Sequence, residues 1–328
     1  MLSNELVVWG LIGLGLLYGL LNGIHDSGGL AAAIVGAGGV SPRRVLLLIA
    51  AGQFVGALVV GVAVARTIGQ GIVEPAALSL SVVLAAIGSA IVWNIATWLL
   101  GLPSSASHAL IGGLVGAAWW RAGAGAIRFS GLAWVAAVLF VAPWAGFAAS
   151  YVAMKALLFL LQGATPKAGP RLRRLQWLLA PLLAAGHGAN DAQKVMGMVT
   201  VGLMAAQAQT AFHVPLWLQL AAALALAAGT SIGGLPILRT LGQRLYRIRP
   251  IHGLSAQLAS SAVVLLSSLA GWPISTTQVI GSSIAGAGSA QRLSQVRWGE
   301  IGNIVAAWLF TIPATAVLGA MLCWLIGG

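Results

Sequence analysis

Two aspartates lie inside apolar stretches that carry almost no other charge. The chain has five acidic residues in 328, and Asp26 and Asp191 stand in the short motifs GIHD and GAND. A carboxylate at the centre of a bilayer costs about 2.5–3.5 kcal/mol on insertion scales, so its presence indicates a functional site. We therefore predict that both aspartates bind a cation such as Na⁺ or take up a proton. The structural alternative is that each caps a half-helix.

Clustered hydroxyl residues follow a proline in each half of the chain, after Pro103 and after Pro273. Proline favours the first turn of a helix, where free N–H groups and the positive end of the helix dipole can bind an anion. Two such cradles facing each other suit the oxygens of phosphate, whereas a single cluster is more often an N-cap. The clusters contain Ser104, Ser105 and Ser107, and Ser275, Thr276 and Thr277.

Basic and imidazole side chains accompany these motifs. Lys194 follows Asp191 by three residues, which is within side-chain reach on a helix, and an intramembrane lysine usually has a carboxylate partner. Our hypothesis is that Lys194 supplies a fixed positive charge where a transported cation would otherwise sit. His25, His108 and His187 are candidates for proton relay, although a lone histidine more often only satisfies a hydrogen bond.

The composition of the chain predicts that these residues lie in an apolar environment. Hydrophobic residues make up 59% of the chain and charged residues 7%, with a mean hydropathy of +0.96, whereas soluble domains have about 25% charged residues. Backbone groups in lipid must be satisfied internally, and the apolar runs are too long for barrel strands, so we predict an all-α polytopic membrane protein. The clearest runs are 5–22, 45–65, 78–100, 216–238 and 301–326.

The net charge of +12 does not indicate nucleic-acid binding, because the 17 Lys and Arg residues are spread among short loops. The single cysteine, Cys323, excludes an internal disulfide. No basic residue precedes the first apolar run, which differs from a cleaved signal peptide, so we expect this run to be retained.

Four motifs recur in the same order, with 165–173 residues between the members of each pair. We therefore predict a first repeat over 1–160 and a second over 175–328, joined by a basic cytoplasmic linker at 161–174. The pairs are GIHD with GAND, RTIGQ with RTLGQ, PSSASH with PISTTQ, and Pro143 with Pro313.

The positive charges of the short loops indicate the orientation of each half, because cytoplasmic loops carry the excess of Lys and Arg. This rule places the linker, the turn 43–44 and the loop 239–249 inside. The net neutral loop from Arg66 to Glu74 and the loop 207–213 then lie outside. Equivalent loops fall on opposite sides, which predicts an inverted-topology repeat of the kind found in secondary transporters.

Inversion requires an odd number of crossings in each half, whereas 1–160 contains roughly six apolar runs. One run must therefore be broken or re-entrant. We predict the break at GIHDSGG, residues 23–29, where an acid and glycines interrupt apolar sequence.

The motifs GIHD, HGANDAQK, PSSASHALIGGLVG and PISTTQVIGSSIAG resemble the inorganic phosphate transporter family, whose members are sodium- or proton-coupled phosphate symporters. The resemblance extends over nearly the whole chain. It implies an inverted-repeat fold of about 10–12 transmembrane segments with broken or re-entrant helices, a homodimer, and phosphate bound between the halves in a plasma membrane. The substrate residues it implies are Asp26, Asn190, Asp191, Ser105, Ser107, Ser275, Thr276 and Thr277. The coupling residues are Asp26, Asp191, Lys194, His25 and His108, with no cofactor beyond Na⁺ at Asp26 or Asp191.

The sequence departs from the family after its first aspartate, where the family reads Asp-Thr-Ala-Asn-Ala and this chain reads DSGGL at 26–30. The missing asparagine removes a carboxamide expected to contact cation or substrate, so sulfate is the first alternative substrate. An anion channel is a further alternative. An intramembrane hydrolase using Ser105, His108 and Asp26 is disfavoured because neither GxSxG nor HExxH occurs. The expectation is a transporter and not an enzyme.

Overall fold

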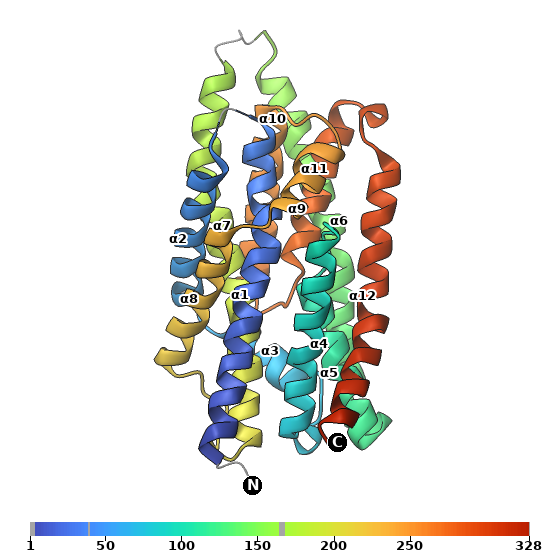
Figure 1. Ribbon diagram of the computed structural model, residues 1–328. Coiled ribbons are helices and arrows are strands. Elements are labelled where there is room, and N and C mark those ends of the chain that lie inside the picture. Colours follow the sequence, from blue (N-terminus) through green and yellow to red (C-terminus); the bar gives the residue numbers. More distant parts are fainter. Residues whose placement is uncertain (1–3, 39, 164–167, 328) are drawn as a thin grey trace.

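The computed structural model describes residues 4–38, 40–163 and 168–327. Within these ranges the regular elements are helices, apart from one isolated β-bridge between Val73 and Ile127. The helices form an elongated bundle with both chain ends at the same end (Figure 1). The predicted all-α class is thereby confirmed.

The first half contains α1 Asn4–Gly36, α2 Pro42–Val59, α3 Ala63–Gly71, the 3₁₀ turn η1 Pro75–Ala77, α4 Leu80–Leu99, α5 Ala106–Ala122, the 3₁₀ turn η2 Ala124–Ala126 and α6 Phe129–Leu160. The second half contains α7 Ala168–Ala205, α8 Leu216–Ile232, α9 Leu235–Arg239, the π turn η3 Thr240–Arg244, α10 Pro250–Leu269, α11 Thr276–Gln291, the 3₁₀ turn η4 Leu293–Gln295 and α12 Trp298–Leu325.

Six helices of the described chain are long and apolar enough to cross a membrane, namely α1, α2, α4, α6, α10 and α12. A seventh span arises if α8 and the segment 235–244, which meet at 60°, count as one. The resemblance implied about 10–12 segments, and the described chain contains further helices that fall outside this set. Of these, α5 and α11 are shorter, and α7 is long but more polar. Large apolar side chains stay exposed on α6 and α12, for example Phe140 and Phe310, which suits a surface that faces lipid.

The halves run in opposite directions and are interlocked. In Figure 1, α1 rises from the end that carries the N label, whereas α7 descends towards that end. Each of these helices packs on the second helix of the other half, α1 on α8 and α7 on α2. Likewise α5 packs on α12, and α11 packs on α6. The predicted inverted repeat is confirmed in this arrangement.

The junction of the halves differs in detail from the predicted linker. α6 ends at Leu160 and α7 begins at Ala168, so residues 168–174 of that linker are helical. Lys167 lies outside the described residues. The repeat boundaries at 160 and 175 stay predictions.

The predicted break at GIHDSGG is wrong, because α1 continues as a helix through residues 23–29. The glycines serve close packing instead. A Cβ at Gly28 would overlap the backbone of Gly234 at the start of α9, and one at Gly23 would overlap the backbone of Leu226 in α8. The helix keeps its own backbone hydrogen bonds, and glycine only lets the neighbouring chain approach.

The breaks lie instead between α4 and α5 and between α10 and α11. Residues 100–105 and 270–275 are non-helical, and the helices on either side of each break pack together as a hairpin. Gly101 and Gly271 have φ of +66° and +72°, which favours glycine. The tips of the two hairpins meet, since the Ser107 hydroxyl donates a hydrogen bond to the Ile274 carbonyl at 2.8 Å. Two hairpins whose tips meet inside the bundle have the arrangement of re-entrant hairpins, although α4 and α10 are each long enough to span a membrane.

The tight contact between α5 and α12 provides a test of this packing. A Cβ at Gly116 would overlap the backbone of Ala316, whereas one at Gly302 on α12 would have no neighbour within 4 Å. We expect Gly116→Val to destabilise the protein by about 1–3 kcal/mol or more through overpacking. The midpoint of thermal unfolding in detergent measures this loss, with Gly302→Val as the matched control. Equal midpoints for the two variants would contradict the close packing.

Candidate functional site

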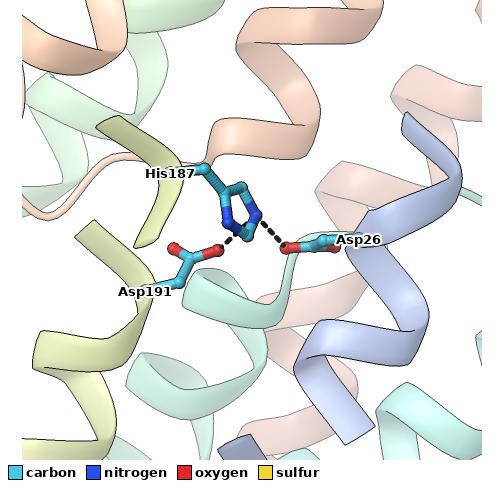
Figure 2. A group of neighbouring side chains, drawn as sticks. All are labelled: Asp26, His187 and Asp191. Carbon is cyan, nitrogen blue, oxygen red and sulfur yellow. Dashed lines mark hydrogen bonds and ion pairs between the residues drawn. The ribbon is translucent and has the colours of Figure 1, made fainter. Parts of the chain in front are cut away.

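The two predicted aspartates lie on either side of His187, and all three side chains are buried (Figure 2). The Nε2 atom of His187 lies 2.8 Å from Oδ2 of Asp191, one turn further along α7. The same atom lies 3.4 Å from Oδ2 of Asp26 on α1. All three side chains are at most 3% exposed. One atom from each lies within 4.8 Å of the others, so the group is able to hold a metal ion.

The sequence indicated His187 only as a candidate for proton relay, and it is not among the predicted coupling residues. Its spacing of four residues from Asp191 is the signal that it shares a helical face with that carboxylate. The contact with Asp26 joins segments 161 residues apart and leaves no such local signal.

Two of the predicted hydroxyl groups reach the carboxylates from the first turn of α11. The Thr277 hydroxyl donates to Oδ1 of Asp26 at 2.7 Å. The Thr276 hydroxyl donates to Oδ2 of Asp191 at 3.1 Å. The tip of the α10–α11 hairpin thus contacts an aspartate from each half.

Lys194 has the predicted partner and two more. Its ammonium group donates to Oδ1 of Asp191, to the Ser107 hydroxyl at 2.6 Å and to the Ile274 carbonyl at 3.0 Å. The side chain is 1% exposed. Lys194 therefore lies between Asp191 and the tips of both hairpins. The position equivalent to Lys194 in the first repeat is Gly29, where no side chain intervenes.

Ser105 and Ser275 fit the N-cap interpretation that the sequence left open. The Ser105 hydroxyl accepts from the backbone N–H of His108 at 3.1 Å, and Ser275 accepts from that of Gln278 at 3.4 Å. The Nδ1 atom of His108 also lies 2.6 Å from the Ser105 hydroxyl and 3.5 Å from Nε2 of Gln278. In the described chain His108 contacts neither aspartate, so the residues of the disfavoured hydrolase do not form a triad.

His25 forms the other side of the Asp26 environment. Its Nδ1 lies 2.9 Å from Oδ1 of Asp26, and its Nε2 lies 3.2 Å from the hydroxyls of Thr97 and Ser104. Thr97 was missed by sequence reasoning because it stands at the end of an apolar run without a motif. It comes into place because α4 packs beside α1.

Asn190 points away from the carboxylates. Its Nδ2 donates to the Trp272 carbonyl at 3.0 Å and to the Ser268 hydroxyl at 3.3 Å. These atoms belong to the end of α10 and the turn that follows. Asn190 therefore holds the α10–α11 turn through its Nδ2 atom, and its predicted contact with substrate stays a prediction.

The comparisons with known proteins agree with one another. Residues 22–319 match the model of the phosphate transporter family. The chain is 39% identical to a Rhizobium meliloti (strain 1021) protein named "Probable low-affinity inorganic phosphate transporter", over 96% of this chain and 95% of that protein. A Bacillus subtilis (strain 168) protein of the same name is 37% identical, over 95% and 94%.

A solved structure has the same fold. "The sodium-dependent phosphate transporter" superposes with a TM-score of 0.87 at 22% identity, over 98% of this chain and 99% of that chain. This likeness concerns the arrangement of helices, including the inverted halves.

The buried pair of Lys194 and Asp191 generates a stability prediction. Removing one partner of a buried ion pair leaves an uncompensated charge and costs about 3–5 kcal/mol. We expect Lys194→Met to lose stability in this range, and the double variant with Asp191→Asn to recover part of the loss. Thermal unfolding in detergent measures both.

The control for this prediction is Lys155→Met, at an exposed lysine over the ring of Tyr151, which should change stability by under about 1 kcal/mol. If the double variant were as unstable as the sum of its single variants, the two charges would not compensate each other.

Proposed function

Because the chain belongs to the phosphate transporter family, we propose that it is a secondary active transporter that moves inorganic phosphate across the plasma membrane by symport with Na⁺ or H⁺. The family consists of transporters and not of enzymes. The site described above would bind phosphate and the coupling ion together, between the two inverted halves.

The observation that supports symport is the net charge of the buried site. Asp26 and Asp191 contribute two negative charges and Lys194 one positive charge, which leaves a net charge of −1 when the histidines are neutral. Adding even a monovalent phosphate would bring this enclosed site to −2. Unbalanced buried charge is strongly unfavourable, so the anion needs accompanying cations or protons. Coupling then follows from electrostatics.

The anion side of the site consists of the two hairpin tips. α5 and α11 both begin there, and the starts of helices favour anions through free N–H groups and the helix dipole. Ser107, Thr276 and Thr277 add hydroxyl donors that now bind a backbone carbonyl or the aspartates. Phosphate would take over these donors, while Ser105 and Ser275 cap the helices that present them.

The cation side consists of the aspartates. Carboxylate oxygens are ligands for hard cations, and they also accept protons. His187 lies in the space between them, with His25 beside Asp26, so a bound Na⁺ would have to replace the contacts of His187. Lys194 would act as the fixed charge in the second half. These side chains are almost fully buried, so access requires one hairpin to move, as in alternating access.

The comparisons do not favour sulfate, since the matched relatives are named for phosphate. Multiple apolar helices and family membership place the protein in a membrane. We propose that the end at which α6 ends and α7 begins faces the cytoplasm, because basic residues gather there, and that the protein forms a homodimer.

Radiolabelled uptake into proteoliposomes tests this function. Phosphate and sulfate are offered with Na⁺ and pH gradients imposed separately. We expect saturable phosphate accumulation that depends on one of the gradients. Accumulation of sulfate without phosphate would refute the proposal, and unitary currents in planar bilayers would indicate a channel instead.

Substituting the aspartates tests the role of the site. We expect Asp26→Asn and Asp191→Asn each to reduce accumulation to background, because the site loses a charge that binds the coupling ion. Glu5→Gln, at an exposed acid in the first turn of α1, is the matched control and should leave uptake unchanged. Normal accumulation in both aspartate variants, with equal insertion in the membrane, would reduce these carboxylates to structural groups.

A further inference from the structure

The central site consists of Asp26, His187, Asp191 and Lys194, and the repeated motif RTIGQ at 66–70 and RTLGQ at 239–243 lies outside it. Each copy of the motif nevertheless forms a hydrogen bond to one of the two hairpins. The Thr67 hydroxyl donates to the Gly271 carbonyl at 2.9 Å, at the turn between α10 and α11. The Thr240 hydroxyl donates to the Gly101 carbonyl at 2.8 Å, at the turn between α4 and α5. Each motif thus contacts the hairpin of the other half. Because the same contact occurs in both halves, the motif has the same structural role in each.

A pocket of about 540 Å³ opens beside the first copy. It is lined by Val62, Arg66, Thr67 and Gln70 of the α3 region and by Ala270 and Gly271 of the α10–α11 turn. The far side of that turn belongs to the central site, because the carbonyl of Ile274 accepts from Lys194. The pocket is therefore separated from the buried site by this one turn, which Thr67 and Asn190 hold from its two sides.

The charge of the pocket is positive. Arg66 is exposed and forms no ion pair within the described part of the chain. The nearest acid in the sequence, Glu74, is engaged elsewhere, since both of its oxygens lie 3.0 Å from the guanidinium of Arg128. That pairing also lowers the pKa of Glu74, so the carboxylate stays charged and bound to Arg128. Arg66 is left free to attract an anion.

We propose that this pocket is a second anion site, at which Arg66 binds inorganic phosphate before the α10–α11 turn opens. The proposal rests on the proposed transport of phosphate and adds a step that precedes the central site. A guanidinium presents several donors in a planar fork that fits two phosphate oxygens. The Gln70 amide lies one turn from Arg66 on α3, so the pocket offers a charged and a neutral donor. The Thr67 hydroxyl lies beside both and keeps its hydrogen bond to the Gly271 carbonyl.

The test measures initial rates of radiolabelled phosphate uptake against phosphate concentration in proteoliposomes. Losing one charged hydrogen-bonding partner should raise KM about threefold to tenfold in Arg66→Gln, with the maximal rate unchanged. The control is Arg121→Gln, at an exposed arginine that ends α5 outside the pocket, and its KM should stay at the wild-type value.

Ionic strength provides a second readout. Raising salt with choline chloride from about 0.01 to about 0.15 M shortens the Debye length from about 30 to about 8 Å. The KM of the wild type should rise with salt, whereas that of Arg66→Gln should change much less. A wild type that transports phosphate, with KM and salt dependence unaltered in Arg66→Gln, would overturn the second site. A wild type that does not transport phosphate would instead refute the proposed function.

Charge rescue separates a role in attraction from a role in folding. In a Cys323→Ser background, Arg66→Cys should show the raised KM. Modification with aminoethyl methanethiosulfonate restores a positive charge and should lower KM again, whereas the neutral hydroxyethyl reagent should not. Equal effects of the two reagents would contradict the electrostatic role of Arg66.

Discussion

The structure depends on keeping two carboxylates charged inside an apolar bundle. Asp26 and Asp191 are at most 3% exposed, so each carboxylate needs hydrogen-bond donors from the protein. His187 contacts both, and Thr277 and Thr276 supply one hydroxyl to each. These donors all belong to the second half, on α7 and at the start of α11, whereas Asp26 lies on α1 of the first half. The need to satisfy the carboxylates therefore fixes how the halves meet.

The two halves meet this need in different ways, although they share a fold. In the first, Asp26 accepts from histidine and threonine side chains only. In the second, Asp191 is paired with Lys194, which also binds the tips of both hairpins. Positions equivalent by repeat thus carry glycine in one half and lysine in the other. The two inverted motifs thus form one asymmetric site, in which a single ammonium group contacts Asp191 and the tips of both hairpins.

Much of this arrangement could be predicted from the sequence. Composition required membrane helices, and the repeated motifs with the loop charges indicated inverted halves. The partner of Lys194 followed from helical spacing. The continuity of α1 could not be predicted, because the sequence does not show whether a glycine interrupts a helix or allows another helix to pack closely against it. At Gly28 the neighbour is α9, which lies more than 200 residues away. The contacts of Thr97 and Asn190 depend on the same kind of distant packing.

The interlocked packing also governs the order in which the protein can be assembled. The hairpin of the first half packs mainly on α12, which is synthesised long after it, and α6 packs on α11. During translation α4 and α5 must therefore wait in the membrane, with polar tips that have no final contacts. The packing of the first half therefore cannot be completed before α11 and α12 have been synthesised. The inverted repeat thus links the assembly of each half to the synthesis of the other.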